Sequence, residues 1–291
     1  MTLSTSQYCG RLFSPADIET IRRFLAAQPD LSRARLSRLV CQALGWYKPD
    51  GGLKDMSCRV ALLRMQKDGL LTLPAPRQCQ GTRQPRITFT ANTAPGPAIT
   101  APVQALPEIQ LQTVNNKKQG QLWREYMHRY HYLGYTPLPG AQIRYLATAG
   151  NHLLALLGFG AAAWKIAPRD QFIGWNPEQR QKNLHLVVNN ARFLILPWIT
   201  SKNLASKLLA LAARRLPEDW RQRYGYRPLL LETFVETQRF PGTCYKAANW
   251  LHVGQTQGRG KLDVRNISPL PPKDIWLYPL SPQFKQLLCS S

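Results

Sequence analysis

ARFLILPWITSKNLASKLLALAARRLPEDW, residues 191–220, is the stretch that decides the fold of the longer part of the chain. It begins with an apolar run that is typical of a buried strand, and residues 201–220 carry apolar side chains at the spacing of a long amphipathic helix. The stretch RPLLLETFVE, residues 227–236, then predicts a further buried strand. A strand, a helix and a strand in this order indicate an α/β domain with a mixed sheet.

The segments on either side extend this pattern over residues 115–291. Turn residues separate short apolar runs, and those runs are long enough for strands. The further predicted elements are a helix at 119–134, a hairpin of strands at 141–148 and 151–164, a mostly irregular segment at 165–190, a short helix at 242–250 and a strand at 251–258.

Residues 1–90 predict a separate, mainly helical domain. Ser14 is a typical N-cap residue ahead of an amphipathic stretch, and two further amphipathic stretches follow, the last ending at Gly69. LLTLP, residues 70–74, and RQPRITFT, residues 83–90, then predict two short strands. Three helices followed by a β-hairpin are typical of a winged helix-turn-helix domain.

In such a domain we expect the third helix to enter the major groove of duplex DNA and the hairpin, or wing, to contact backbone phosphates. The third helix and the wing are both basic here. A small helical dimerisation domain is the alternative interpretation of the same pattern. The side chains expected to contact DNA in this part of the chain are Lys54, Ser57, Arg59, Arg64, Lys67, Arg83 and Arg86.

Residues 91–114 are rich in proline and carry a single charge. Proline fixes φ and has no amide N–H to donate, so such a stretch favours an extended linker over a helix. The sequence therefore predicts three parts: a winged helix-turn-helix domain at 1–90, a linker at 91–114 and a basic mixed-sheet α/β domain at 115–291.

The charge of the chain indicates a protein that binds phosphate groups. There are 38 Lys and Arg against 16 Asp and Glu, a formal net charge of +22. Residues 1–90 carry 14 basic and 6 acidic side chains, and the rest carries 24 and 10, so both parts are basic. This excess disfavours an ordinary metabolic enzyme and favours nucleic acid as the partner. A basic protein kept soluble by its charge is the alternative.

The cysteines and the apolar runs indicate where in the cell the protein is expected. The six cysteines form no C-x-x-C pair, so neither a zinc finger nor a disulfide framework is expected. No signal peptide is expected, and the longest apolar run, Leu153 to Trp164, is too short to span a bilayer. We therefore expect a cytoplasmic protein that does not contact a membrane.

Two resemblances to known families follow from these stretches. The order of elements, with the helix and strand from Tyr245 to Gly254, resembles the GNAT acetyltransferase fold. The sequence itself resembles the Druantia anti-phage DruA family, which long, ordered stretches match, among them LKDMSCRVALLRMQKDGLLTLP, VVNNARFLILPWI and GTCYKAANWLHVGQTQGRGKLD. That resemblance implies bacterial anti-phage defence or mobile-element biology, and similar domains occur fused to transposases.

The glycines from Gln255 to Gly260 have the Q-x-x-G-x-G pattern with which acetyltransferases hold the pyrophosphate of CoA. In a GNAT fold those glycines follow a central strand and open the next helix, so that helical N–H groups face the pyrophosphate. The equivalent stretch here, Thr200 to Ser206, contains no glycine. We therefore expect no acetyl-CoA binding, and we interpret Arg259 and Lys261 as cations of a basic loop that contacts DNA.

A metal-dependent nickase or strand transferase is the alternative function. Asp170 and Glu232 would hold Mg²⁺ or Mn²⁺, and Glu236, on the same strand face as Glu232, would be a third ligand. The side chains that could supply a base, a nucleophile or charge stabilisation are His131, Tyr132, Tyr245 and Lys246.

A structural interpretation of the same residues stays open. Glu232 could instead pair with Arg169 or Arg180, both of which are also candidate DNA contacts, and His131 could be a packing residue.

The sequence thus predicts a DNA-binding protein of a defence or mobile-element system. It would bind duplex DNA through the winged helix, and it would engage DNA, including single strands, with a GNAT-like domain. Other defence or transposition proteins and further copies of the chain are candidate partners. The nickase or strand transferase is the alternative, and an acyl-CoA acyltransferase is the third candidate.

Overall fold

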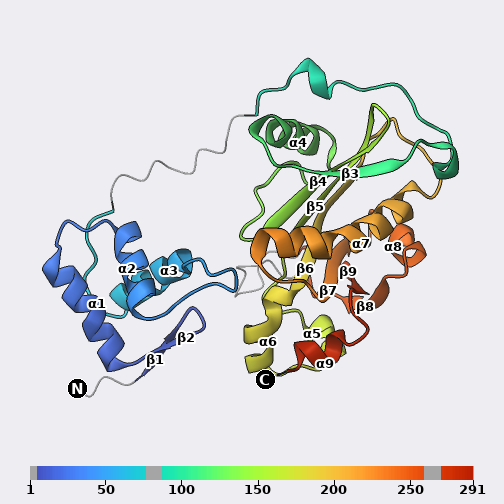
Figure 1. Cartoon of the computed structure of the whole chain (residues 1–291). Coiled ribbons are helices and arrows are strands. Elements are labelled where there is room, and N and C mark those ends of the chain that lie inside the picture. Colours follow the sequence, from blue (N-terminus) through green and yellow to red (C-terminus); the bar gives the residue numbers. More distant parts are fainter. Residues whose placement is uncertain (1–4, 77–86, 259–269, 291) are drawn as a thin grey trace. The chain divides into compact units, whose positions relative to one another are not determined.

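The computed structural model describes residues 5–76, 87–258 and 270–290. The chain divides into two compact units, Met1–Arg86 and Ile87–Ser291, and each is described by itself (Figure 1). Among the described residues, no helix is both long enough and apolar enough to cross a membrane.

The first unit is a three-helix domain preceded by a short hairpin. Its elements are the antiparallel strands β1 (Ser6–Tyr8) and β2 (Arg11–Phe13), and the helices α1 (Pro15–Ala27), α2 (Arg33–Ala43) and α3 (Asp55–Lys67). Ser14 caps α1 in a capping box, and Ser32 caps α2, as their positions in the sequence suggest. Ile18, Ile21, Leu36, Val40, Leu62 and Met65 are among the fully buried residues of its core.

The described residues do not form the predicted wing. Residues 70–74 pair with no strand in the described part of the chain, and side chains bond to their backbone instead. Arg22 donates to the Leu70 carbonyl, Arg33 donates to the Pro74 carbonyl, and Gln66 accepts from the Leu73 N–H. Of the second predicted strand, residues 83–86 lie outside the described part of the chain, and 87–90 belong to the second unit without strand structure.

The second unit is an α/β domain with a large mixed sheet, as the GNAT resemblance implies. Its strands are β3 (Ile109–Thr113), β4 (Gln142–Ala149), β5 (His152–Ala161), β6 (Val187–Ile195), β7 (Leu230–Glu236), β8 (Leu251–Gln255) and β9 (Lys273–Pro279). Its helices are α4 (Lys117–Tyr130), α5 (Ala167–Ile173), α6 (Pro177–Asn183), α7 (Leu204–Tyr224), α8 (Thr243–Ala247) and α9 (Phe284–Leu288), with 3-10 turns at Ala91–Thr93, Val103–Ala105 and Leu184–Leu186.

The strands follow the order β3-β4-β5-β6-β7-β9-β8. Each neighbouring pair of these described strands is antiparallel except β6 and β7, which are parallel and are connected through α7. The stretch 191–220 therefore supplies most of the central strand and of its crossover helix.

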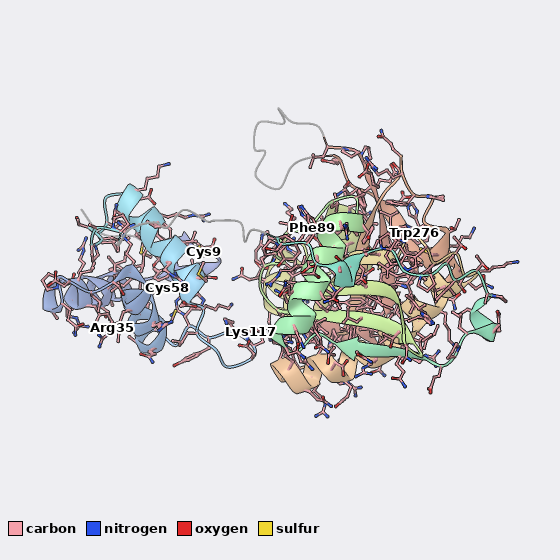
Figure 2. The ribbon with its side chains drawn as sticks, turned by 90° about the horizontal axis from the view of Figure 1, so that it is seen from above. Cys9, Arg35, Cys58, Phe89, Lys117 and Trp276 are labelled. Carbon is pink, nitrogen blue, oxygen red and sulfur yellow. The ribbon has the colours of Figure 1, made fainter. Side chains whose placement is uncertain are left out.

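Helices cover both faces of the sheet. Arg144 of β4 stacks on Trp123 of α4, and the next residue, Tyr145, donates to Asp219 of α7 over 2.7 Å. Because successive strand residues point to opposite faces, α4 and α7 lie on opposite sides of the sheet, as Figure 2 shows. A second buried cluster, with Leu230, Ile275 and Leu277 at its centre, joins the sheet to α5 and α9.

Two predictions for the second unit need correction. Residues 91–114 are not a free linker, because Ile109–Thr113 is strand β3, whose Ile109, Leu111 and Thr113 alternate with glutamines. The abundance of proline earlier in the stretch obscured this period of two. The segment at 165–190 is not mostly irregular either: it contains α5, α6, a 3-10 turn and the start of β6.

The segment before β3 is fixed to the domain by a buried carboxylate on α4. Glu125 is 1% exposed and accepts hydrogen bonds from the Thr90 N–H (2.9 Å) and hydroxyl (2.8 Å), from Thr93 (3.3 Å) and from Gln121 (3.0 Å). Burial raises the pKa of Glu125, but these hydrogen bonds together outweigh burial, and the pKa lies below its usual value. Close by, Phe89, which is labelled in Figure 2, packs against the ring of His128.

Replacing Glu125 with alanine should release this segment, because the buried donors of Thr90 lose their acceptor. We expect the free energy of unfolding to fall by about 2–3 kcal/mol at neutral pH. Since the folded-state pKa is lowered, the contribution of Glu125 is present above the usual pKa of a glutamate and is lost as the pH falls below it. Limited proteolysis should then cut the segment between Ile87 and Gly96, whereas Glu108→Ala, at an exposed position, should resist cutting. Equal resistance of both variants would contradict the anchoring role.

Candidate functional site

A cleft opens where β6 and β7 separate. The two strands pair over only three positions, from Val187 with Leu230 to Asn189 with Glu232, and each then continues without the other. The cleft has a volume of about 590 Å³. Its lining comes from the end of α4 and the three residues after it, the two strands, the first turn of α7, the loop before α8, α8 itself and the first residue of β9. Since α4 and α7 cover opposite faces, the cleft is bordered from both sides of the sheet.

The course of β6 beside the cleft contains a bulge. Gly158 of β5 pairs with Arg192 and Phe159 with Asn190, which leaves Ala191 as an extra residue. Bulges bend a strand and re-aim its side chains, and they are common next to binding sites. The bulge lies within the stretch of β6 that lines the cleft, residues 189–195.

Asn190 is fixed in place by its neighbours. Its side-chain oxygen accepts from the Tyr245 hydroxyl (3.1 Å), and its backbone carbonyl accepts from Thr233 (3.0 Å). Burial raises the pKa of Tyr245, so its hydroxyl stays protonated at neutral pH. Tyr245, expected as a possible nucleophile, is therefore placed as a residue that holds the wall of the cleft.

Asn189 and Arg192 are two lining residues with hydrogen-bonding groups that have no described partner. The Oδ1 atom of Asn189 is buried and has no hydrogen-bond partner among the described residues. Arg192 is half-buried, and its only described hydrogen bond runs from Nη1 to the Ala191 carbonyl (2.7 Å). Burial lowers the pKa of Arg192, and no carboxylate of the described chain pairs with it.

His131 borders the cleft at the end of α4, as a neutral side chain. Burial first, and then the charge of Arg192, lowers the pKa of His131 from 6.5 to about 4. Its Nδ1 accepts from the Leu133 N–H (3.2 Å). The neutral ring therefore carries its proton on Nε2, where it is a hydrogen-bond donor.

Aromatic rings lie at the rim of the cleft. Tyr132 is 39% exposed and Phe240 is 44% exposed, and their rings meet edge to face at 5.3 Å. Arg239 lies over the Tyr132 ring and pairs with Glu236 (3.0 Å). Of the predicted catalytic residues, His131, Tyr132 and Tyr245 thus meet at the cleft, and Glu236 lies near its rim.

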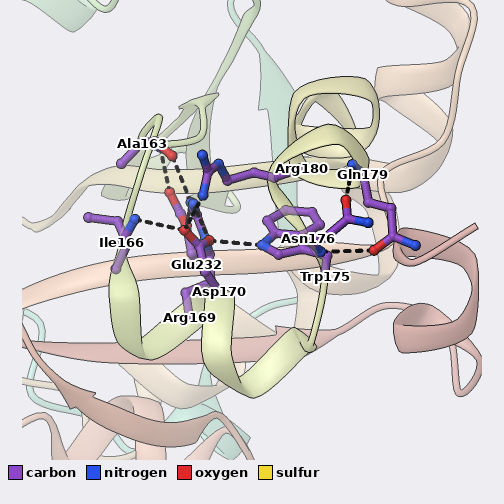
Figure 3. Close-up of polar contacts among 9 residues, drawn as sticks. All are labelled: Ala163, Ile166, Arg169, Asp170, Trp175, Asn176, Gln179, Arg180 and Glu232. Atoms are coloured by element: carbon purple, nitrogen blue, oxygen red, sulfur yellow. Dashed lines mark hydrogen bonds and ion pairs between the residues drawn. The ribbon is translucent and has the colours of Figure 1, made fainter. Parts of the chain in front are cut away.

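Asp170 and Glu232 meet elsewhere, in a compact ion network (Figure 3). Arg169 is fully buried and donates to Glu232 and to Asp170, both over 2.7 Å. Glu232 also accepts from the Ala163 N–H (2.8 Å). Asp170 also accepts hydrogen bonds from the Ile166 N–H, the Trp175 indole N–H and Arg180.

These carboxylates do not fit a metal site. Each of their four oxygens already accepts from a protein N–H, and Arg169 and Arg180 pair with the two carboxylates, so Mg²⁺ or Mn²⁺ would have to displace these donors. No group of three or more His, Cys, Asp or Glu in the described ranges could hold a metal ion. Burial raises the pKa of Glu232, while Arg169 and the Ala163 N–H act in the opposite direction. The arrangement is the structural ion pair that the sequence left open, and it also occupies the guanidinium of Arg169.

The remaining candidate residues are not among the described lining of the cleft. Lys246 is exposed on α8 and does not line it. Lys54 is the N-cap of α3, and that helix carries Ser57, Arg59, Arg64 and Lys67, with Arg59 paired to Asp55 (3.0 Å). Arg83, Arg86, Arg259 and Lys261 lie outside the described residues.

Sequence reasoning missed Asn189, Asn190, Arg192, Thr233 and Phe240 as lining residues. One signal for the first three was present, because two asparagines and an arginine interrupt the apolar run of VVNNARFLI. Polar side chains in the middle of a central strand are costly unless they are bonded or used. Thr233 and Phe240 carry no comparable signal.

Glu232→Gln tests the role of the ion network. Removing one partner leaves the buried positive charge of Arg169 without one of its two compensating carboxylates, so we expect a loss of about 3–5 kcal/mol in the free energy of unfolding. Glu218→Gln is the matched control, since Glu218 pairs with Arg221 on the surface and should contribute at most about 1 kcal/mol. Chemical denaturation measures both. Equal stability of wild type and Glu232→Gln would contradict the structural role.

The chain is similar to several solved acetyltransferases at low identity. It is 14% identical to the aminoglycoside acetyltransferase AAC(6')-Ib in complex with coenzyme A, covering 63% of this chain and 100% of that one with a TM-score of 0.40. It is 10% identical to a spermidine N-acetyltransferase SpeG chimera from Vibrio cholerae and hSSAT, covering 59% of this chain and 95% of that one with a TM-score of 0.39. It is 13% identical to a probable GNAT-family acetyltransferase from Chromobacterium violaceum, covering 71% of this chain and 98% of that one with a TM-score of 0.37.

No curated protein matches the sequence. A family model does match, and it covers the end of α3, the segment before β3 and most of the second unit, including β6 and β7, which border the cleft. The matched residues, 65–269, are more than half of the chain, and their description is Druantia protein DruA. The chain therefore belongs to the Druantia protein DruA family.

Proposed function

We propose that this protein binds nucleic acid as a cytoplasmic component of an anti-phage defence system, together with other proteins of that system. Family membership supports the defence role. The observation that carries nucleic-acid binding is the net charge of +22. With 38 Lys and Arg against 16 Asp and Glu, most of the cations have no carboxylate of the chain to neutralise them.

The first unit offers a surface for duplex DNA on α2 and α3, which pack against each other. Arg35 and Arg38 of α2 and Arg64 and Lys67 of α3 are exposed, and no described carboxylate pairs with them; Arg35 is labelled in Figure 2. α3 also exposes Met56, Val60 and Leu63, which lie at helical spacing on one face. Cations suit phosphates, and apolar side chains suit the thymine methyl groups of the major groove. These features support binding through a helix-turn-helix surface without requiring the wing.

Replacing Arg64 and Lys67 together with glutamine should weaken the binding of a labelled duplex. If each cation neutralises one phosphate, the slope of log affinity against log salt should become shallower by about two. Arg221→Gln with Arg227→Gln removes the same charge from residues that pair with Glu218, and we expect that control to bind nearly as well as wild type. Fluorescence anisotropy of the full chain at two salt concentrations measures the slopes. No binding by wild type at about 50 mM salt, or an equal loss in the control, would contradict the proposal.

We also propose that the protein does not use acetyl-CoA. The turn before α7 has no glycine, and its backbone is already engaged by the segment before β3: Ile99 donates to the Trp198 carbonyl and accepts from Thr200, and Val103 donates to the Lys202 carbonyl. This position therefore lacks the glycines that would let the N–H groups at the start of the helix come close to a pyrophosphate.

Calorimetric titration of the full chain with acetyl-CoA should accordingly give no heat of binding. The same titration with desulfo-CoA is the control for a reaction of the ligand. A dissociation constant in the micromolar range for either ligand would contradict this part of the proposal and would favour acyl transfer.

A further inference from the structure

The charge of the cleft between β6 and β7 points to an anionic ligand. Its described lining includes Arg192 and Lys273, and none of its described lining residues is Asp or Glu. Of the two carboxylates that flank its lining on β7, Glu232 is paired with Arg169 and Glu236 with Arg239.

Arg192 is the most informative of the two cations. A half-buried guanidinium has lost part of its hydration, and this cost is normally offset by a carboxylate or another anion. The fully buried Arg169 follows that rule, with one carboxylate on each side. Arg192 faces the cleft without such a partner in the described chain. Because a guanidinium binds phosphate through paired N–H donors, a phosphate is a suitable counterion there.

The cleft also has complementary hydrogen-bonding groups for a polar ring edge. Asn189 offers a buried acceptor, Oδ1, that no described donor satisfies. His131 borders the same space with an Nε2–H donor. An unsatisfied buried acceptor costs about 1–3 kcal/mol, which a ligand N–H would recover.

An exposed aromatic ring next to these groups suits a planar ligand. Phe240 borders the cleft and is 44% exposed, whereas the Tyr132 ring beside it already stacks on His131 at 4.9 Å and has Arg239 over it. Aromatic side chains of this kind stack on nucleobases whatever the base, because every base has a π-face. The volume of about 590 Å³ lies within the range of small-molecule sites.

We propose that this cleft binds a nucleotide, with its phosphate on Arg192, its base edge at Asn189 and His131, and its ring against the aromatic rim. The nucleotide is either a free mononucleotide or an unpaired residue of a nucleic-acid strand, since both offer the same chemistry. The inference goes beyond the proposed function, because it rests on the cleft of the second unit and not on helices α2 and α3.

Calorimetric titration of the full chain with AMP, adenosine and ribose 5-phosphate tests which parts of the ligand are needed. We expect AMP to bind, and adenosine and ribose 5-phosphate to bind at least about tenfold more weakly, because each lacks one of the two recognised groups. If ribose 5-phosphate binds as well as AMP, the cleft recognises only an anion and the nucleotide assignment is wrong.

Variants locate the site. Arg192→Gln and Asn189→Ala should each raise the dissociation constant of the tightest ligand by about tenfold or more. Arg192→Lys keeps the charge but loses the fork of donors, so its affinity should lie between those of wild type and Arg192→Gln. Arg144→Gln is the matched control, since Arg144 is also half-buried without a described carboxylate partner but stacks on Trp123 away from the cleft. Melting temperatures of all variants establish that they fold.

A single-stranded tetradeoxyadenylate, titrated in parallel, distinguishes the two sources of the nucleotide. Tighter binding of the strand than of AMP, lost in Arg192→Gln, identifies an unpaired residue of a strand as the ligand; binding of AMP alone identifies a free nucleotide. Arg64→Gln with Lys67→Gln should leave both titrations unchanged, so that failure of duplex binding and failure of the cleft are separate results. No heat with either ligand, or unchanged affinity in Arg192→Gln, would overturn the inference.

Discussion

The short parallel pairing of β6 and β7 is the constraint on which the rest of the second unit depends. Parallel strands need a crossover, and α7 supplies it by covering one face of the sheet between them. The pairing ends at Asn189 and Glu232, so the two strands leave a cleft instead of a continuous sheet. Glu232 is held at that point by Arg169 of α5, which fixes the strand where the separation begins.

Two arginines of the second unit, Arg169 of α5 and Arg192 of β6, are in opposite situations. Arg169 is fully buried and has two carboxylates, so its charge is compensated inside the protein. Arg192 is half-buried beside the cleft and has none among the described residues. In a chain with 16 acidic residues against 38 basic ones, carboxylates are scarce. The cations that are paired with a buried carboxylate are therefore the structural ones. The charges without a carboxylate are those available to an external anion.

Much of the fold could be predicted from the sequence, because hydrophobic periodicity is a local property. Residues 191–220 and 227–236 indicated the central strands and their helix, and Ser14 and Ser32 marked two helix starts that the structure has. β3 was missed because the prolines before it dominated the composition, and the start of β6 was missed because Asn189 and Asn190 interrupt its apolar run. The prediction of a strand at 70–74 was wrong, because side chains, and not a neighbouring strand, bond to the backbone of these residues.

The candidate site could be predicted only in part. The sequence singled out His131, Tyr132 and Tyr245, which the fold brings to one cleft, but their partners come from β6, β7 and the loop before α8. It also singled out Asp170 and Glu232, which do meet, yet as ligands of Arg169. Which polar residue is satisfied and which is not depends on neighbours distant in the sequence, and this decides between a structural and a binding role.

The central claim is that the separation of β6 and β7 creates a nucleotide-binding cleft. A crystal structure of the full chain grown with AMP or with a short single strand tests it most directly. The account predicts a phosphate within hydrogen-bond distance of the Arg192 guanidinium, and a base whose N–H group faces Asn189 Oδ1. A nucleotide bound elsewhere, with the cleft between the two strands left to water, would contradict it.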